Sequence, residues 1–124
     1  MKRQLLMLTA AVAIAQSAVA ADLKPAVVFD MGGKFDKSFN QGVYEGVERF
    51  KKETGVKYRE FEVTNPSQRE QAIRKMAQRK ANPVLAIGFA QATALEKVAK
   101  DFPETKFSII DAVVKLPNVQ SIVF

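Results

Sequence analysis

Hydrophobic and polar positions alternate between two periods along the chain from Ala26 onward. Short apolar runs recur, and most are followed by a segment whose apolar positions lie three or four residues apart. Runs of the first kind are typical of buried strands, and segments of the second kind are typical of amphipathic helices. The pattern predicts strands at residues 26–29, 56–63, 84–87, 107–110 and 119–124, and helices that begin at Ser38, at Ser67 and near Ala92.

The alternation of strands with helices predicts an α/β fold with a mostly parallel sheet and helices on both faces. Residues 56–63 mix apolar and charged side chains, which favours a more exposed strand near a sheet edge. No linker or low-complexity stretch divides residues 21–124. Neither a helix nor a polar tail follows the last predicted strand, so we expect the domain to be truncated.

Two capping boxes mark helix starts in the sequence. Ser38 is followed three residues later by Gln41, and Ser67 is followed in the same way by Glu70. In this motif the serine side chain accepts a hydrogen bond from the backbone N–H three residues further on. We therefore expect Ser38 and Ser67 to cap the first two helices.

The first 20 residues have the three-part layout of a secretory signal peptide. A basic start at Lys2 and Arg3 precedes an apolar run at residues 5–15, and residues 18–20 form an A-x-A cleavage pattern. The apolar run is too short to cross about 30 Å of hydrocarbon comfortably. We therefore expect cleavage near Ala20 and a periplasmic product, without the lipid anchor that a cysteine at the cleavage site would carry.

Composition removes several classes of chemistry. The 124 residues include no Cys and no His, which excludes thiolate nucleophiles, zinc sites built on those ligands and Ser-His-Asp triads. The net charge of +6 first suggests an anionic partner, but it falls to +4 when Lys2 and Arg3 leave with the signal peptide.

Several basic residues crowd one segment, where Glu70 interrupts them. A charge run of this kind is typical of the solvated side of a helix. No aromatic interleaving, zinc-finger spacing or helix-turn-helix pattern accompanies it, so we expect no nucleic-acid partner. The basic residues of this segment are Arg69, Arg74, Lys75, Arg79 and Lys80.

The carboxyl ends of the predicted strands carry the candidate binding residues, because ligands of open parallel sheets bind there. Asp30 and Asp111 directly follow apolar strands and can accept hydrogen bonds, and Asn40 can both donate and accept them. A planar ligand can stack on Phe39 or Phe35. These properties suit a neutral, polar molecule that contains a ring.

Simpler interpretations of this loop stay open in the sequence. Asp36 and Ser38 can cap the helix that follows, Phe39 can equally pack in the core, and Phe89 can be a wall residue. The end of the loop resembles a phosphate-binding motif, but Asp36 and Met31 stand where that motif needs glycine. We therefore expect no nucleotide phosphate site.

Five segments of the chain carry a family resemblance. They read FDMGGKFDKSFN at residues 29–40, IGF at 87–89, DFPETKF at 101–107, IID at 109–111 and PNVQSIVF at 117–124. Together they resemble the basic membrane protein family, which consists of substrate-binding proteins of ABC transporters and includes the purine-nucleoside-binding PnrA-like branch. The resemblance extends over about residues 26–124.

The resemblance implies a type I periplasmic-binding fold, in which two α/β lobes close on a ligand. Residues 21–124 would form part of the N-terminal lobe. The chain would then be a gene fragment, a truncated reading frame, or half of a split protein whose second lobe another chain supplies. The function implied is the periplasmic solute-binding component of an ABC importer, with no catalysis, cofactor or metal. It would bind a purine nucleoside or a similar small molecule between the lobes and deliver it to the permease.

The resemblance also assigns roles to residues. In the nucleoside-binding branch, aromatic side chains from the two lobes sandwich the base, so Phe39 would stack on the ligand. The expected polar contacts are Asp30, Asn40 and Asp111, with Ser38 and Phe89 as further candidates.

Two other functions stay open at this point. Asp30, Asp36 and Asp111 would lie near one edge of the sheet and can hold a metal for phosphoryl transfer. Alternatively, the chain is a fragment with no independent function, in which case residues 21–124 would show no cooperative thermal unfolding.

Overall fold

The computed structural model describes residues 23–124, so the predicted signal peptide lies outside the described residues. The described part contains five strands, three α-helices and one short 3₁₀ helix. In chain order these are β1 (Ala26–Phe29), α2 (Phe39–Thr54), β2 (Arg59–Glu62), α3 (Gln68–Gln78), β3 (Val84–Ile87), η1 (Phe89–Gln91), α4 (Ala92–Asp101), β4 (Phe107–Ile110) and β5 (Val119–Ile122). The predicted α/β fold is confirmed, although β2 and β5 are shorter than expected and η1 was not predicted.

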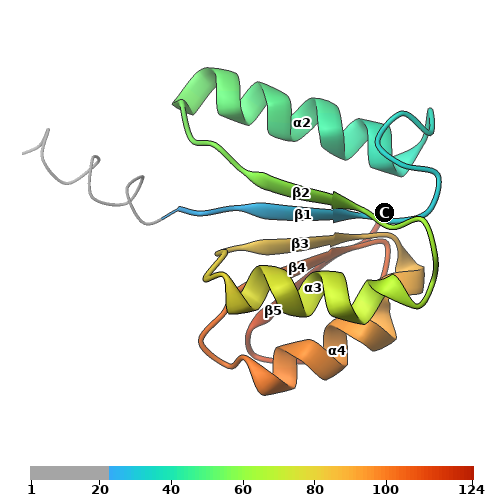
Figure 1. Cartoon of the computed structure of the whole chain (residues 1–124), viewed down its shortest axis with the longest axis vertical. Helices are drawn as coiled ribbons and strands as arrows, with labels where there is room; N and C mark the ends of the chain where they lie inside the picture. The colour runs from blue at the N-terminus through green and yellow to red at the C-terminus, as the bar shows by residue number, and fades with distance from the viewer. Residues whose placement is uncertain (1–22) are drawn as a thin grey trace, which may run out of the picture.

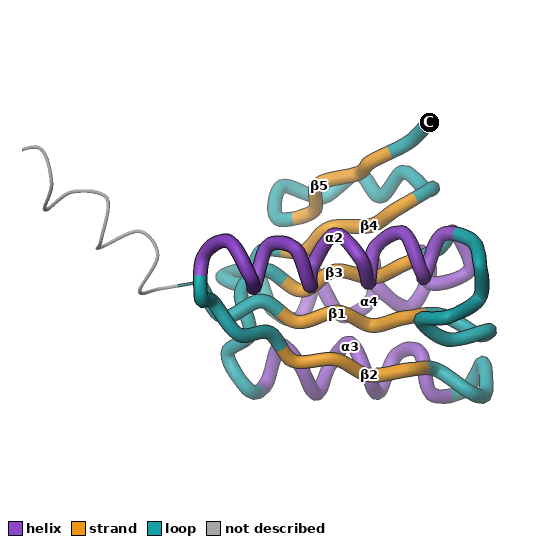
Figure 2. Tube along the Cα trace, turned by 90° about the horizontal axis from the view of Figure 1, so that it is seen from above, coloured by secondary structure: helices purple, strands orange, loops and turns teal. Residues whose placement is uncertain are grey.

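The five strands form one sheet in the order β2-β1-β3-β4-β5, and every neighbouring pair is parallel. Figure 2 shows this order across the sheet, with β2 and β5 at its edges. All four residues of β2 are exposed, which confirms the predicted edge strand. The chain runs from β1 through α2 to β2 on one side and later returns to β3 on the other side of β1.

Helices cover both faces of the sheet, as the sequence predicted. Figure 1 shows α2 on one face and α3 with α4 on the other. Successive strand residues point to opposite faces, so Val28 and Ile109 belong to the core under α3 and α4, whereas Val27 and Ile110 belong to the core under α2. Because both faces are buried, the central strands are apolar at nearly every position.

The capping predictions for Ser38 and Ser67 are wrong, because neither side chain caps its helix. Before α2, Asp36 Oδ1 accepts hydrogen bonds from the backbone N–H groups of Ser38 at 2.8 Å and Gln41 at 3.1 Å. The alternative in which Asp36 caps this helix is therefore confirmed. An anion is also favoured at this end of the helix dipole. Before α3, Asn65 Oδ1 accepts the bond from the Ser67 N–H at 3.0 Å.

Replacing Asp36 with alanine is expected to destabilise the chain by about 1 kcal/mol at pH 7, since a helix cap is lost. Burial raises the pKa of Asp36, but hydrogen bonds from Gln41 and Ser38 outweigh burial and lower the pKa below its ordinary value. The stabilisation is therefore present above the ordinary pKa and is lost as the pH falls through the lowered one. Urea denaturation of the unmodified and variant chains at pH 7 and near pH 3 measures the loss of stability and its dependence on pH.

Ser38→Ala is the matched control, because the Ser38 side chain makes no capping bond. It is expected to change the free energy of unfolding by less than about 0.5 kcal/mol. An equal loss in Asp36→Ala at both pH values would contradict the assignment of the cap to the Asp36 carboxylate.

Candidate ligand-binding site

The central strands separate at the carboxyl edge of the sheet. β1 and β3 pair from Ala26↔Val84 as far as Val28↔Ala86 and no further. Beyond this point β1 follows β2 and β3 follows β4. At this point the order in which successive strands are added to the sheet changes direction: β2 lies on one side of β1 and β3 on the other. Open α/β sheets bind ligands in the crevice at such a point.

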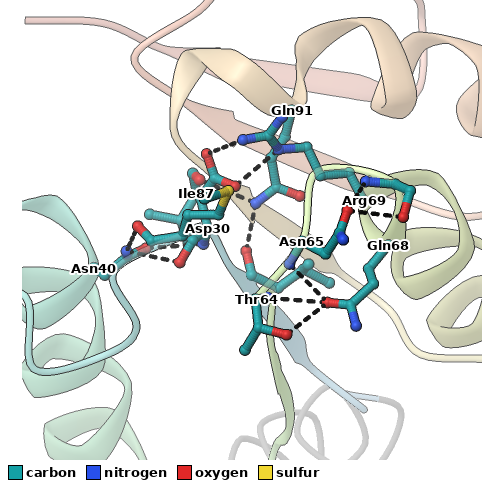
Figure 3. A network of polar contacts seen from close by, with 11 residues as sticks. Asp30, Asn40, Thr64, Asn65, Gln68, Arg69, Ile87 and Gln91 are labelled. Atoms are coloured by element: carbon teal, nitrogen blue, oxygen red, sulfur yellow. Dashed lines mark hydrogen bonds and ion pairs between the residues drawn. The ribbon is translucent and has the colours of Figure 1, made fainter.

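Gln91 bridges the two central strands at the point where they separate. Its Nε2 donates to the carbonyl oxygens of Val28 at 2.8 Å and Ile87 at 3.0 Å, and the residue is fully buried. Gln91 Oε1 is also buried and has no hydrogen-bond partner among the described residues. Gln91 therefore joins the ends of β1 and β3 from the turn of η1 (Figure 3).

Asp30 forms a two-point ion pair with Arg69, as Figure 3 shows. Arg69 Nε donates to Oδ1 at 2.9 Å and Nη2 donates to Oδ2 at 3.2 Å. Their side chains are only 16% exposed for Asp30 and 19% for Arg69. The interpretation of this basic segment as the solvated side of a helix is therefore wrong for Arg69, because a carboxylate 39 residues away in the sequence binds its guanidinium.

Asn40 is buried at the start of α2, with 4% of its surface exposed. Its Oδ1 accepts from the Asp30 N–H at 3.1 Å, and its Nδ2 donates to the carbonyl oxygens of Asp30 at 3.1 Å and Met31 at 3.4 Å. These bonds fix the backbone that carries the Asp30 carboxylate. A contact between Asn40 and a ligand stays a prediction.

The loop after β1 is tied to the edge strand. Its turn contains Gly32 at φ 102° and Gly33 at φ 73°, and the Gly33 N–H donates to the Asp30 carbonyl at 3.2 Å. The Lys34 N–H donates to Glu62 Oε1 at 2.9 Å. The Lys34 ammonium also forms an ion pair with Glu60 of β2. The hydrogen bond in that pair is the main cause of the raised pKa of Lys34.

An apolar hollow of about 470 Å³ lies beside α2 near the carboxyl edge. Phe39 is 49% exposed, and its ring centroid lies 6.1 Å from that of Phe124. The alternative in which Phe39 is a core residue is therefore wrong, and its ring is open to a partner. The residues that line the hollow are Ser38, Phe39, Gly42, Val43, Ile110 and Phe124.

The other two candidates lie at the ends of neighbouring strands. Asp111 follows β4 directly, is partly exposed and has a left-handed backbone at φ 66°, with its N–H donating to the Ile122 carbonyl at 2.7 Å. Phe89 begins η1 after β3 and is 71% exposed. The structure thus places all six predicted residues at the carboxyl edge or at the start of α2, and it joins Asp30 directly to Asn40.

Sequence reasoning missed Arg69 and Gln91 as members of this site. The charge run groups Arg69 with the other cations of its segment, although its place in the first turn of α3 is unfavourable for a cation next to the helix dipole. That misplaced charge was the available signal. The partners of Gln91 are set by the strand order, and no local pattern indicates them.

Among residues 23–124, no three carboxylates come together in a way that could hold a metal ion. Asp30 binds Arg69 and Asp36 caps α2, so these residues and Asp111 do not form the cluster that the metal-dependent alternative requires. Within the same part of the chain, no helix is both long and apolar enough to cross a membrane.

Comparison with known proteins identifies the family. Residues 23–124 match the Bmp family, described as ABC transporter substrate-binding protein PnrA-like. The chain belongs to the Bmp family. Bmp proteins are a family of substrate-binding proteins and are not a family of enzymes.

Individual Bmp relatives agree with this assignment. An uncharacterized lipoprotein of Pyrococcus furiosus is 43% identical over 94 residues, which cover 73% of this chain and 23% of the relative. The ABC transporter nucleoside-binding protein BmpA of Lactococcus lactis is 34% identical over 111 residues, which cover 86% of this chain and 32% of BmpA. This Bmp chain thus spans less than a third of the length of either relative.

Solved structures show the same fold. A solute-binding protein of an ABC transporter system from Aeropyrum pernix is 30% identical, with a TM-score of 0.75 over 82% of this chain and 28% of that protein. A second one, from Conexibacter woesei, is 28% identical, with a TM-score of 0.70 over 80% of this chain and 34% of that protein. The parallel sheet of this Bmp chain is therefore similar to part of larger solute-binding proteins.

Proposed function

We propose that the chain is part of the extracytoplasmic solute-binding component of an ABC importer and that its ligand is a purine nucleoside. The observation that carries the proposal is the half-exposed Phe39 ring at an apolar hollow, on the same edge as the Asp30 carboxylate. An aromatic face next to hydrogen-bond acceptors suits a planar base attached to a hydroxyl-bearing sugar. The name of the BmpA relative supports the same ligand class.

Each candidate residue has a role in this proposal. Phe39 stacks on the base, while Asp30 and Asp111 accept hydrogen bonds from its N–H groups or from ribose hydroxyls. Asn40 acts mainly by holding the backbone of Asp30, which its amide already binds on both sides. Ser38 and Phe89 are further contacts at the rim of the site.

A second lobe completes the site in the proposed mechanism. An open edge leaves much of a ligand in water, and burial between two lobes supplies the desolvation that affinity needs. The ligand stabilises the closed arrangement because it contacts both lobes only in that state. The closed protein then docks on the permease in the membrane. Another chain, or a further part of the same polypeptide, supplies the second lobe.

Replacing Phe39 with alanine is expected to weaken nucleoside binding by about 5- to 150-fold, because stacking on an aromatic ring contributes about 1–3 kcal/mol per base. Isothermal titration calorimetry of the complete two-lobed protein with adenosine, guanosine and inosine measures this. The matched control is Phe35→Ala. Phe35 is an exposed ring of the loop just before α2. It packs edge-on against Tyr44 with 5.2 Å between the ring centroids, and its loss should leave the affinity within about twofold.

Two results would count against the proposal. If none of the three nucleosides produced heat, the nucleoside assignment would fail. If Phe39→Ala bound as tightly as the unmodified protein, Phe39 would be removed from the site while the ligand class stood.

A further inference from the structure

The Asp30–Arg69 pair connects two elements on either side of the crevice. Asp30 ends β1, and Arg69 lies in the first turn of α3. A cation in that position is opposed by the helix dipole, so α3 gains nothing from it locally. The compensation comes from the carboxylate, which the planar guanidinium meets at two points (Figure 3). The position of Arg69 is thus explained by Asp30 and not by the helix.

The pair leaves part of the carboxylate available. An ionised carboxylate has about four lone-pair sites, and the Arg69 fork uses one on each oxygen. The neighbouring residue Gly88 has no side chain, and a Cβ there would lie 3.6 Å from Asp30 Oδ2. The absent side chain leaves this side of the carboxylate uncovered, and 16% of the Asp30 side chain is exposed. Asp30 can therefore keep Arg69 and still accept a bond from a ligand.

The charge of the pair restricts what that ligand can be. Arg69 neutralises Asp30, so a cationic ligand finds no net negative charge at this point. The rigid fork also holds the carboxylate in one orientation, which a flexible lysine would not do. A neutral N–H or O–H donor matches both properties.

We propose that Arg69 is a positioning residue of the ligand site: it holds the Asp30 carboxylate neutralised and oriented toward a neutral hydrogen-bond donor on the nucleoside. This inference rests on the proposed function. Arg69 itself need not touch the ligand, because it acts through Asp30.

The experiment compares inosine with 2′-deoxyinosine and 3′-deoxyinosine, which each lack one ribose hydroxyl, and with purine riboside, which lacks the base N1–H together with the 6-oxo group. Calorimetry on the two-lobed protein is expected to show at least one analogue binding about tenfold more weakly than inosine. In Arg69→Met, the ratio of the dissociation constant of that analogue to the dissociation constant of inosine should shrink to about threefold or less, because the freed carboxylate no longer favours one donor. A purely structural role would weaken inosine and the analogue equally and leave their ratio unchanged.

Two further variants complete the test. Arg74→Met is the matched control, since Arg74 lies on the same helix but pairs with Glu70 and Asp101. The ratio of analogue to inosine dissociation constants in this variant should stay as in the unmodified protein. Arg69→Lys keeps the charge without the fork and should give an intermediate ratio. It also provides the measurement if Arg69→Met does not fold.

The failures of the two proposals can be told apart. If inosine binds and the ratio persists in both Arg69 variants, Arg69 is not a positioning residue, although nucleoside binding stands. The inference falls in the same way if no analogue is discriminated against by the unmodified protein. If no nucleoside binds at all, the proposed function fails and this inference fails with it.

Discussion

Replacing Gln91 with leucine is expected to lower the free energy of unfolding by about 1–3 kcal/mol, since two buried hydrogen bonds are lost and each contributes about 0.5–1.5 kcal/mol. Gln91 Nε2 bonds the carbonyl oxygens of both Val28 and Ile87, and the residue is fully buried. Leucine has a similar volume, so the loss reports the two carbonyls more than a cavity. Urea denaturation followed by circular dichroism measures it.

Two comparisons make the Gln91 result specific. Gln71→Leu changes an exposed glutamine of α3 and is expected to stay within about 0.5 kcal/mol of the unmodified chain. Gln91→Glu keeps the shape but presents a carboxylate that cannot donate, so it should be at least as destabilising as leucine at pH 7. If Gln91→Leu were as stable as the unmodified chain, Gln91 would not be what joins the strand ends.

Most of the fold could be predicted because each element has its own local pattern. The central strands β1 and β3 are covered on both faces, and this burial produces the continuous apolar runs that identify them. α4 shows apolar side chains at helical spacing because one side of it packs on the sheet, with Leu95 and Val98 fully buried. In these segments the apolar positions of the sequence are the positions that the fold buries.

The details at helix starts could not be predicted in the same way. Ser38 and Asp36 both have an oxygen that can cap α2, and the sequence favours the serine by its spacing to Gln41. The turn of the preceding loop decides the competition, because it places the Asp36 carboxylate within 3.1 Å of the Gln41 N–H. Such a loop conformation depends on Gly32 and Gly33 and on contacts with β2 that are distant in the sequence.

The site was predicted in its outline but not in its polar connections. Strand ends at one edge of a parallel sheet follow from the order of elements, so the positions of Asp30, Phe89 and Asp111 were accessible. The polar partners of these strand ends were not accessible from the sequence. Arg69 lies 39 residues from Asp30, and Gln91 lies 63 residues from Val28, so only the strand order brings them together.

The Asp30–Arg69 pair provides the second large effect. Asp30→Ala is expected to destabilise the chain by about 2–3 kcal/mol, because it leaves a largely buried guanidinium without its carboxylate. This lies at or below the roughly 3–5 kcal/mol usual for breaking a buried ion pair, since both side chains keep some contact with water. Asp101→Ala is the control: it breaks a pair with Arg74 in which the carboxylate is 54% exposed, and it should cost less than about 1 kcal/mol.

The double variant Asp30→Ala/Arg69→Met decides whether the cost comes from an isolated charge. Removing both partners leaves no unpaired ion, so the double variant should be more stable than Asp30→Ala alone. Denaturant titration of the four chains gives the coupling free energy, which should exceed about 1 kcal/mol for groups in direct contact. Additive losses would mean that the two groups do not interact in solution. In that case the neutralised carboxylate could not define which donors the site accepts, and the crevice would select its ligand through Phe39 and Asp111 instead.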